Sequence, residues 1–581
     1  MRNLAAYLKK YRKESIIAPL FKLLEALFDL FVPLVVARMI DANGSTGSTK
    51  TVWISFGVLL LMATVGLCAT LLAQYYAAKA STGFGGALRQ AMFDRIQSFS
   101  FTELDRLGTD TLITRLSDDV NQVQTGLNMG LRLLLRSPFI VFGSVIMAFT
   151  IDVRCALIFA VAVPILFGVV YLIMQISIPL FSKAQSGLDR VTAMTRENLT
   201  GVRVIRAFCR EEQSAAEFDR SNRALTKLNL FVGRISALMN PLTYVLINIA
   251  AVVLIRVAGV RVSLGALPQG QVVALYNYML QITVELIKLA SLIITLNKSV
   301  ACAKRASAVL QIEPSMHFPA QDAQSIKDAP VVEFRNVTFT YNNAGAPSLS
   351  DITFCAAAGQ TVGIIGGTGS GKSTLVSLIS RSYDATEGSV LLDGVPIERY
   401  TKQSLCDRIG VVPQRAVLFR GTIRENLRWG NENATDDALW EALTLAQAKT
   451  VVQDKPNGLD FVLEQGGKNL SGGQRQRLTI ARALVKQPEI LILDDSSSAL
   501  DYATDAALRQ AIRSLSGTTT TFLVSQRIAC VRRADRIVVL DNGALAGSGT
   551  HDELMAGCAV YREIYYSQFP EERPTAASKE V

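Results

Sequence analysis

Histidine and cysteine are too scarce and too scattered in this chain to build a metal centre or a disulfide framework. The 581 residues include only two histidines, His317 and His551. Eight cysteines stand at positions 68, 155, 209, 302, 355, 406, 530 and 558, with no CxxC pair and no histidine at a ligand spacing. We therefore expect buried or free thiols, in a reducing cytosol or a bilayer.

The N-terminal segment also lacks the features of a cleavable signal peptide. Its basic residues (Arg2, Lys9, Lys10, Arg12 and Lys13) lead into a long apolar segment without a short apolar core and a small-residue cleavage site. We expect this segment to stay attached.

Apolar residues, in contrast, are abundant and gather in the first 300 positions. Half of all residues are hydrophobic and the mean hydropathy is +0.29, which is too apolar for a soluble protein of this length. A helix of about 20 apolar residues crosses a bilayer. Six segments qualify as predicted spans: roughly 15–40, 53–78, 137–152, 155–181, 236–258 and 272–298.

The distribution of Lys and Arg predicts the orientation of these spans. Basic residues are frequent at the N-terminus and in segments 81–136 and 182–235, and almost absent near 41–50 and 152–154. The positive-inside bias places both termini and the two long loops in the cytoplasm. The net charge of +10 follows the membrane boundaries rather than one face, so we expect no nucleic-acid partner.

The two long loops show apolar residues at three- and four-residue spacing, which is typical of helices. We expect them to extend the neighbouring spans into the cytosol, with short crossing segments near Ser100–Gly108 and Val204–Glu212.

Ionisable residues inside predicted spans require a structural or functional explanation, because placing each of them in lipid costs free energy. Glu25 and Asp29 are four residues apart, a turn after Lys22, and Glu285 and Lys288 are three apart. They could line a substrate cavity or form structural ion pairs facing a water-filled interior. Both interpretations stay open.

The composition divides the chain after the spans. Residues 301–330 are mixed and polar and contain Pro314 and Pro319, which predicts a linker after a transmembrane domain at 1–300. Residues 331–567 are predicted to form one α/β domain, and the polar segment 568–581 a mobile tail.

The α/β domain contains a phosphate-binding motif in its required context. The string 366–373 matches G-x-x-x-x-G-K-[ST], follows an apolar strand at 361–365 and opens a helix. Backbone N–H groups of such a loop surround phosphate oxygens, the lysine reaches the β- and γ-phosphates, and the hydroxyl binds Mg²⁺. The predicted ATP contacts here are Gly366, Gly367, Thr368, Gly369, Ser370, Gly371, Lys372, Ser373 and Thr374.

A second motif, Leu470-Ser471-Gly472-Gly473-Gln474, resembles the signature of ATP-binding-cassette (ABC) proteins. With it, residues 1–567 resemble an ABC exporter half-transporter. The resemblance implies an α-helical six-span transmembrane domain followed by an α/β P-loop nucleotide-binding domain. It also implies that two such chains form the working unit.

The resemblance assigns further roles. Tyr341 would stack on adenine, Gln414 would be the Q-loop residue that binds Mg²⁺, and Asp494 would hold Mg²⁺ through water. The signature residues Ser471, Gly472, Gly473 and Gln474 and the D-loop residue Asp501 would contact ATP held by the other chain. Glu464-Gln-Gly-Gly resembles the X-loop, and 196–208 resembles the second intracellular loop of exporters.

Two positions depart from the family pattern. Asp495 stands where the family carries the Glu that polarises the attacking water, and Gln526 stands where it carries the switch His. Gln can donate a hydrogen bond to a γ-phosphate but cannot carry positive charge as His can. Both changes weaken phosphoryl transfer rather than ATP binding, so we expect this Walker site to bind ATP and hydrolyse it slowly. The alternative is drift without consequence.

Because the family's domains dimerise head to tail, the resemblance favours a heterodimer with a complete partner, as in bacterial multidrug-type exporters. A homodimer and a non-transporting ATP-gated channel or regulatory subunit are the alternatives. The expected function is ATP-driven export of a hydrophobic or amphipathic, drug- or lipid-like substrate. The expected location is the cell membrane of a bacterium, among membrane lipids.

Overall fold

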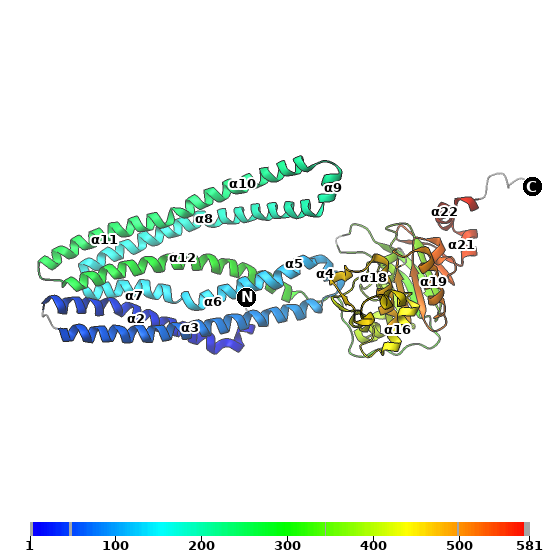
Figure 1. The fold of residues 1–581 in the computed structure, drawn as a ribbon, viewed down its shortest axis with the longest axis horizontal. Coiled ribbons are helices and arrows are strands. Elements are labelled where there is room, and N and C mark those ends of the chain that lie inside the picture. Colours follow the sequence, from blue (N-terminus) through cyan, green and yellow to red (C-terminus); the bar gives the residue numbers. More distant parts are fainter. Residues whose placement is uncertain (1–3, 46–48, 343, 497–498, 574–581) are drawn as a thin grey trace, which may run out of the picture. The chain divides into compact units, whose positions relative to one another are not determined.

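The computed structural model describes residues 4–45, 49–342, 344–496 and 499–573. The chain forms two compact units, Met1–Gln97 with Asp110–Ile312, and Ser98–Thr109 with Glu313–Val581 (Figure 1). All eight cysteines are free thiols. The end of the predicted tail, 574–581, lies outside the described residues.

The first unit is built from helices. The long ones are α2 (Arg12–Ser45), α3 (Thr49–Gln97), α6 (Val120–Leu133), α7 (Arg136–Ile151), α8 (Val153–Thr200), α10 (Glu211–Ala237), α11 (Met239–Ser263) and α12 (Gln269–Gln311). Shorter elements are α1 (Ala5–Leu8), η1 (Lys9–Tyr11), α5 (Thr109–Thr114), the π-helical turn η2 (Arg115–Asp119) and α9 (Val202–Ala207).

By length and composition, five helical segments within the described residues are apolar enough to cross a membrane: Thr49–Gln97, Thr109–Ile151, Val153–Thr200, Glu211–Ser263 and Gln269–Gln311. The predicted first span forms a 34-residue helix, α2, but does not meet the same criterion. Its charged residues Lys22, Glu25, Asp29, Arg38 and Asp41 are spaced so that every stretch of 18 residues contains more than two charges. The prediction of six spans is therefore not confirmed as a count.

The segment Thr109–Ile151 is interrupted at Leu134 and Leu135, and α7 begins at Arg136. Pro138 explains the break, because it has no N–H to donate to the carbonyl of Leu134 and its ring crowds that carbonyl. The interruption places Arg136 and Ser137 at the start of a new helix.

Helix α12 forms the centre of the first unit, packing along α2, α6 and α7. Tyr278 of α12 is fully buried, and its hydroxyl donates to the carbonyl oxygen of Leu30 at 2.6 Å. Small buried residues such as Ala274 and Ala37 let these helices approach closely.

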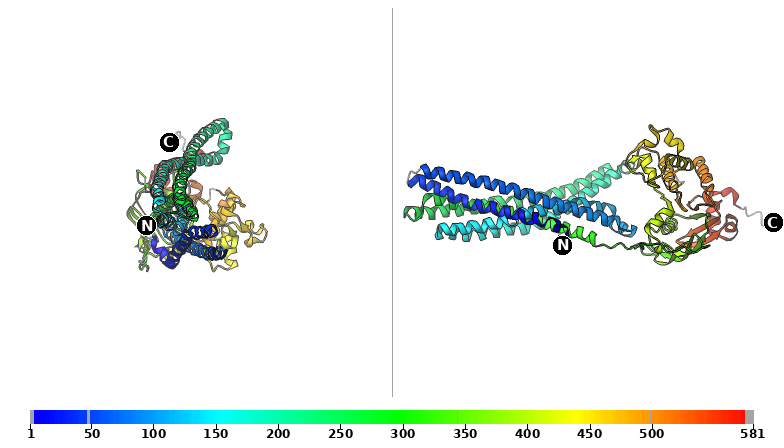
Figure 2. Two further views of the ribbon diagram at one scale, coloured as in Figure 1. Left: turned by 90° about the vertical axis from the view of Figure 1, so that its left-hand side faces the viewer. Right: turned by 90° about the horizontal axis from the view of Figure 1, so that it is seen from below.

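The ends of α8 and α10 that α9 joins diverge from the other helices of this unit, as both Figure 1 and the left view of Figure 2 show. Apolar side chains near this turn are exposed: Leu199 by 70%, Val204 by 60% and Phe208 by 72%. One of the two predicted crossing segments thus forms a helix, α9, at Val202–Ala207. The other forms α4 (Phe101–Leu107), in the second unit.

The second unit contains two main sheets. The antiparallel sheet has the order β2 (Leu349–Ala356), β1 (Val332–Phe339), β4 (Glu387–Leu392) and β5 (Val395–Pro396). The six-stranded sheet has the order β12 (Ala544–Gly549), β11 (Arg536–Asp541), β3 (Thr361–Gly366), β10 (Thr520–Val524), β9 (Ile490–Asp494) and β6 (Ile409–Val412). Only β12 runs antiparallel in it. Its inner strands are continuous apolar runs because both faces are covered. A small pair joins β7 (Gly421–Thr422) and β8 (Val462–Leu463).

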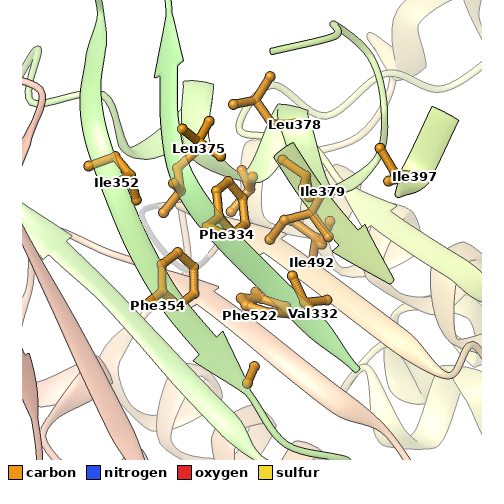
Figure 3. Close-up of a cluster of buried hydrophobic side chains, with 14 of the residues drawn as sticks. Val332, Phe334, Ile352, Phe354, Leu375, Leu378, Ile379, Ile397, Ile492 and Phe522 are labelled. Carbon is orange, nitrogen blue, oxygen red and sulfur yellow. The ribbon is translucent and has the colours of Figure 1, made fainter. Parts of the chain in front are cut away.

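Helices and one aromatic core hold the two sheets together. Phe334 of β1 and Phe354 of β2 stack with ring centroids 4.7 Å apart, against Leu375, Ile492 and Phe522 (Figure 3). The surrounding helices are α13 (Lys372–Ile379), α14 (Lys402–Arg408), α15 (Ile423–Arg428), α16 (Asp436–Leu445), α17 (Lys449–Gln453), α18 (Gly472–Val485), α19 (Tyr502–Arg513), α20 (Ile528–Val531), α21 (His551–Gly557) and α22 (Ala559–Gln568).

Candidate nucleotide-binding site

The loop between β3 and α13 adopts a backbone that its glycines make accessible. Gly369 and Gly371 have φ values of 81° and 93°, in the left-handed region that glycine enters without strain. A Cβ at Gly366 would lie 2.2 Å from the carbonyl oxygen of Leu540. Glycine is therefore required at these positions for the loop to turn tightly onto the N-terminus of α13.

The register of the parallel strands brings the acidic residues to this loop. Val524 of β10 pairs with Asp494 of β9 on one side and with Ile364 of β3 on the other. The carboxyl ends of the three strands thus meet at one edge, where ligands bind in such sheets. There the Ser373 hydroxyl donates to Asp494 Oδ1 at 3.0 Å.

A cavity of about 560 Å³ opens at this edge. The predicted residues that line it are Tyr341, Thr368, Gly369, Gly371, Lys372, Ser373, Thr374, Gln414, Asp494, Asp495 and Gln526. Tyr341 OH and Thr374 Oγ1 are 3.1 Å apart, and Gln414 Nε2 lies 3.4 Å from Asp495 Oδ2. The cavity also has lining residues that motif reasoning missed, among them Ser348, Asn542 and Gly543.

Two charged side chains of the cavity, Lys372 and Asp494, are partly removed from water. Lys372 Nζ donates to the carbonyl oxygens of Gly366 at 3.1 Å and Gly367 at 2.6 Å. Burial lowers the pKa of Lys372, opposed by the nearby Asp495 and Asp494 carboxylates. Burial also raises the pKa of Asp494, against the hydrogen bond from Ser373. Both shifts show that this edge disfavours unneutralised charge.

The Ser373 hydroxyl and the Asp494 carboxylate fit a hard divalent cation such as Mg²⁺. They are two oxygen donors 3.0 Å apart at the start of a helix, and Mg²⁺ prefers oxygen ligands. The amide oxygen of Gln414 is a further ligand type at the same cavity.

Asp494→Asn should stabilise the ligand-free protein and abolish the stabilising effect of Mg²⁺ with ATP. A carboxyl with a raised folded-state pKa costs stability once it is ionised, so the cost is fully present above the folded pKa and fades as the pH falls through the folded pKa toward the unfolded value. Thermal unfolding with and without Mg-ATP measures both effects. Asp501→Asn is the matched control, because hydrogen bonds from Thr504 lower the pKa of Asp501 and its removal should not stabilise. A lower melting temperature for ligand-free Asp494→Asn would contradict the prediction.

The predicted signature and D-loop residues do not line this cavity. Ser471 is the N-cap of α18, where its hydroxyl accepts from the Gln474 N–H at 3.3 Å and the Gln474 side chain accepts from the Ser471 N–H at 3.1 Å. Gly472 and Gly473 begin this helix. Asp501 caps α19, accepting from the Thr504 N–H at 3.1 Å. Ser497 and Ser498 of the predicted D-loop lie outside the described residues.

A tyrosine that the motifs did not indicate, Tyr383, connects Tyr341 of the cavity to α4. The Tyr383 ring lies 5.3 Å from that of Tyr341 and 6.0 Å from that of Phe101. Its hydroxyl donates to Asp105 Oδ2 at 2.6 Å. Asp105 and Tyr383 are 278 positions apart in sequence, so no local spacing could have indicated the pair.

Comparison with known proteins agrees with this geometry. The family model of the ABC transporter transmembrane region matches residues 15–286, and a second family model, described as ABC transporter, matches residues 349–498. An uncharacterized ABC transporter ATP-binding protein of Mycobacterium tuberculosis is 38% identical over 97% of both chains. The uncharacterized ABC transporter ATP-binding protein YfiB of Bacillus subtilis is 34% identical, over 98% of this chain and 99% of that protein.

A more distant relative and a solved structure extend the comparison. An ATP-dependent lipid A-core flippase of Syntrophus aciditrophicus is 30% identical, over 90% of this chain and 86% of that protein. A bacterial Atm1-family ABC exporter with ATP bound shares the fold, with a TM-score of 0.81 at 24% identity, over 97% of this chain and 99% of that one. The expectation of an ABC transporter is confirmed. The chain belongs to the ABC transporter family, as a half-transporter whose transmembrane region is fused to one ATPase domain.

Proposed function

We propose that this chain is one half of an ATP-driven exporter and that its own Walker site binds ATP but hydrolyses it slowly. The observation that carries the proposal is the composition of the cavity at the sheet edge. The ATP-holding residues Tyr341, Lys372 and Ser373 share it with Asp495 and Gln526, which replace the usual catalytic Glu and His. The groups that bind ATP are present there, while the group that polarises the attacking water and the group that contacts the γ-phosphate are both altered.

Each group has a distinct role in this proposal. The loop glycines and Lys372 hold the phosphates, and Tyr341 stacks on adenine. Ser373 and Gln414 would hold Mg²⁺ directly and Asp494 through water, and the cation would neutralise phosphate charge. Asp495 is the water-polarising carboxylate, and Gln526 donates to the γ-phosphate without adding positive charge. The slow step is therefore phosphoryl transfer.

A second chain completes the site in this proposal. The signature residues Ser471–Gln474 do not line the chain's own cavity, which supports a head-to-tail partner whose ATP they contact. The exposed apolar residues near α9, Leu199, Val204 and Phe208, supply a surface that a partner would cover. We propose a heterodimer, because a homodimer would contain two weakened sites.

The proposed substrate is a hydrophobic or amphipathic molecule, moved across the cell membrane of a bacterium with the ATPase domain and both termini in the cytoplasm. The apolar helices and the basic loop segments support this placement. The lipid A-core flippase among the relatives supports an amphipathic substrate. A non-transporting channel or regulatory role is the rival function.

Measuring substrate flux in sealed vesicles distinguishes export from a non-transporting channel or regulatory function. We expect inverted vesicles that contain this chain and its partner to accumulate a fluorescent amphiphile only with Mg-ATP. Lys372→Ala in this chain should weaken ATP binding at the impaired site, since the lysine contacts phosphates. ATP-gated ion conductance without amphiphile accumulation would instead establish the channel function.

A further inference from the structure

Six charged side chains meet in the first unit, between α2, α7 and α12. Arg136, at the break before α7, is the centre of this cluster. Its Nη2 lies 2.9 Å from Asp29 Oδ2 and 3.6 Å from Glu25 Oε1, and its Nη1 lies 2.7 Å from Glu285 Oε1. Lys22 pairs with Glu25 at 2.5 Å, and Lys288 with Glu285 at 3.0 Å.

These contacts favour the ion-pair interpretation for Glu25. The sequence leaves open whether Glu25 and Asp29 line a substrate cavity or form structural ion pairs. Glu25 is partly buried between Lys22 and Arg136, with its side chain 14% exposed. A cation would have to displace both partners to reach it. Glu25 therefore has a structural role in the cluster rather than a role in contacting a ligand.

Burial divides the cluster into a neutral interior and two exposed groups. The side chains of Lys22, Glu25, Arg136 and Glu285 are 14% exposed or less, and their two positive and two negative charges balance. The Asp29 and Lys288 side chains are 41% and 43% exposed. The accessible part of the cluster is thus one carboxylate and one ammonium group, joined through Arg136 and Glu285.

Unused hydrogen-bonding atoms border this pair. Gln281 of α12 donates from Nε2 to the Asp29 carbonyl oxygen at 3.1 Å, while its buried Oε1 and the buried Nε of Arg136 have no hydrogen-bond partner among the described residues. Buried polar atoms of this kind are costly unless a ligand or water satisfies them.

An apolar groove begins beside the cluster. Its volume is about 510 Å³, and it is lined by Pro19, Leu131, Leu134, Leu135, Leu296 and Val300, among others. Pro19 precedes Lys22 by one turn of α2, and Leu135 directly precedes Arg136. On α12, Leu296 lies two turns beyond Lys288. The groove therefore lies along α2 and α12, the two helices that carry five of the six charged residues, although none of the six lines it.

We propose that the cluster and groove bind a zwitterionic amphiphile, with its ammonium group on Asp29, its phosphate or carboxylate on Lys288, and its alkyl chain in the groove. A ligand with a single charge would contact only one of the two exposed groups and add net charge to a low-dielectric site, which is unfavourable. A zwitterion keeps the complex neutral. This inference names the substrate class of the exporter and rests on the proposed function.

Equilibrium binding to the full-length chain in detergent, without ATP, tests this inference. The probes are lysophosphatidylethanolamine, lysophosphatidylglycerol and an alkylamine of the same chain length. We expect lysophosphatidylethanolamine to bind about tenfold more tightly than the other two, a difference of about 1.4 kcal/mol, since each singly charged probe lacks one charge-assisted hydrogen bond. Equal affinity for the three probes would overturn the proposal.

Single substitutions test the contribution of each exposed charge, Asp29 and Lys288, to ligand selectivity. Asp29→Asn should remove the preference over lysophosphatidylglycerol, and Lys288→Gln should remove the preference over the alkylamine. Asp29→Glu, which keeps the charge, should retain the preference, and Arg256→Gln, an exposed residue of α11 outside the cluster, is the matched control. Wild-type selectivity in Asp29→Asn or Lys288→Gln would contradict the inference. Selective binding without ATP-dependent flux would overturn only the proposed export.

Discussion

Asp495→Glu combined with Gln526→His should raise the Mg-ATPase activity of the purified, dimeric chain on the order of 100-fold. The extra methylene of Glu advances the carboxylate by about an ångström, and a misplacement of that size can cost about 100-fold in rate. Histidine can supply the positive charge that Gln lacks. Phosphate release in lipid nanodiscs measures the result.

The structure adds a local cost to this double substitution. Asp495 has a φ of 43°, in the left-handed region that Asp tolerates better than Glu. We expect the variant to lose about 1 kcal/mol of stability while gaining activity, so its melting temperature should be measured in parallel. A higher melting temperature of the double variant would not by itself account for a higher rate of ATP hydrolysis.

Three controls make the result interpretable. Lys372→Ala on the double-variant background should return the activity to background, because its contact with the phosphates is lost. Cross-linking identifies the dimeric fraction, since an unassembled chain lacks the partner's signature. Wild-type activity far above that of Lys372→Ala would contradict the impaired site and favour a homodimeric exporter in which Asp495 suffices.

Arg136→Met should destabilise the transmembrane unit by about 3 kcal/mol. The substitution removes one cation that faces three carboxylates, and breaking a buried ion pair from one side costs about 3–5 kcal/mol. The lower end applies, because Glu25 keeps Lys22 and Glu285 keeps Lys288 and the Ser137 hydroxyl. Reversible unfolding in mixed micelles measures the change.

A double-substitution cycle tests whether the cost comes from the ion pair. Glu285→Gln on the Arg136→Met background should cost less than Glu285→Gln alone, because its partner is already absent. Arg256→Met, at an exposed position, should change stability by less than about 0.5 kcal/mol. A loss below 1 kcal/mol for Arg136→Met would show that the cluster is solvated rather than buried.

The sequence by itself determined the family and the identity of the motifs. The loop 366–373, the string 470–474 and the apolar strand before Asp494 are local patterns, in which each residue type is required by the backbone or the chemistry at that position. The departures at Asp495 and Gln526 could be recognised in the sequence for the same reason. Each follows an apolar strand at a fixed position in its motif. The expected effect of each on phosphoryl transfer therefore follows from residue type and motif position alone.

Only the tertiary structure decided which charges meet inside the transmembrane unit and which aromatic group adjoins the nucleotide site. Spacing along one helix predicted pairs such as Glu285 and Lys288, but Arg136 is 107 positions from Asp29 and 149 from Glu285. Its place follows from the break at Pro138 and from the packing of α7 between α2 and α12. Tyr383 and Asp105 likewise meet only through the fold. Helical periodicity reports neighbours within a few residues, whereas contacts between helices depend on packing that no single segment encodes.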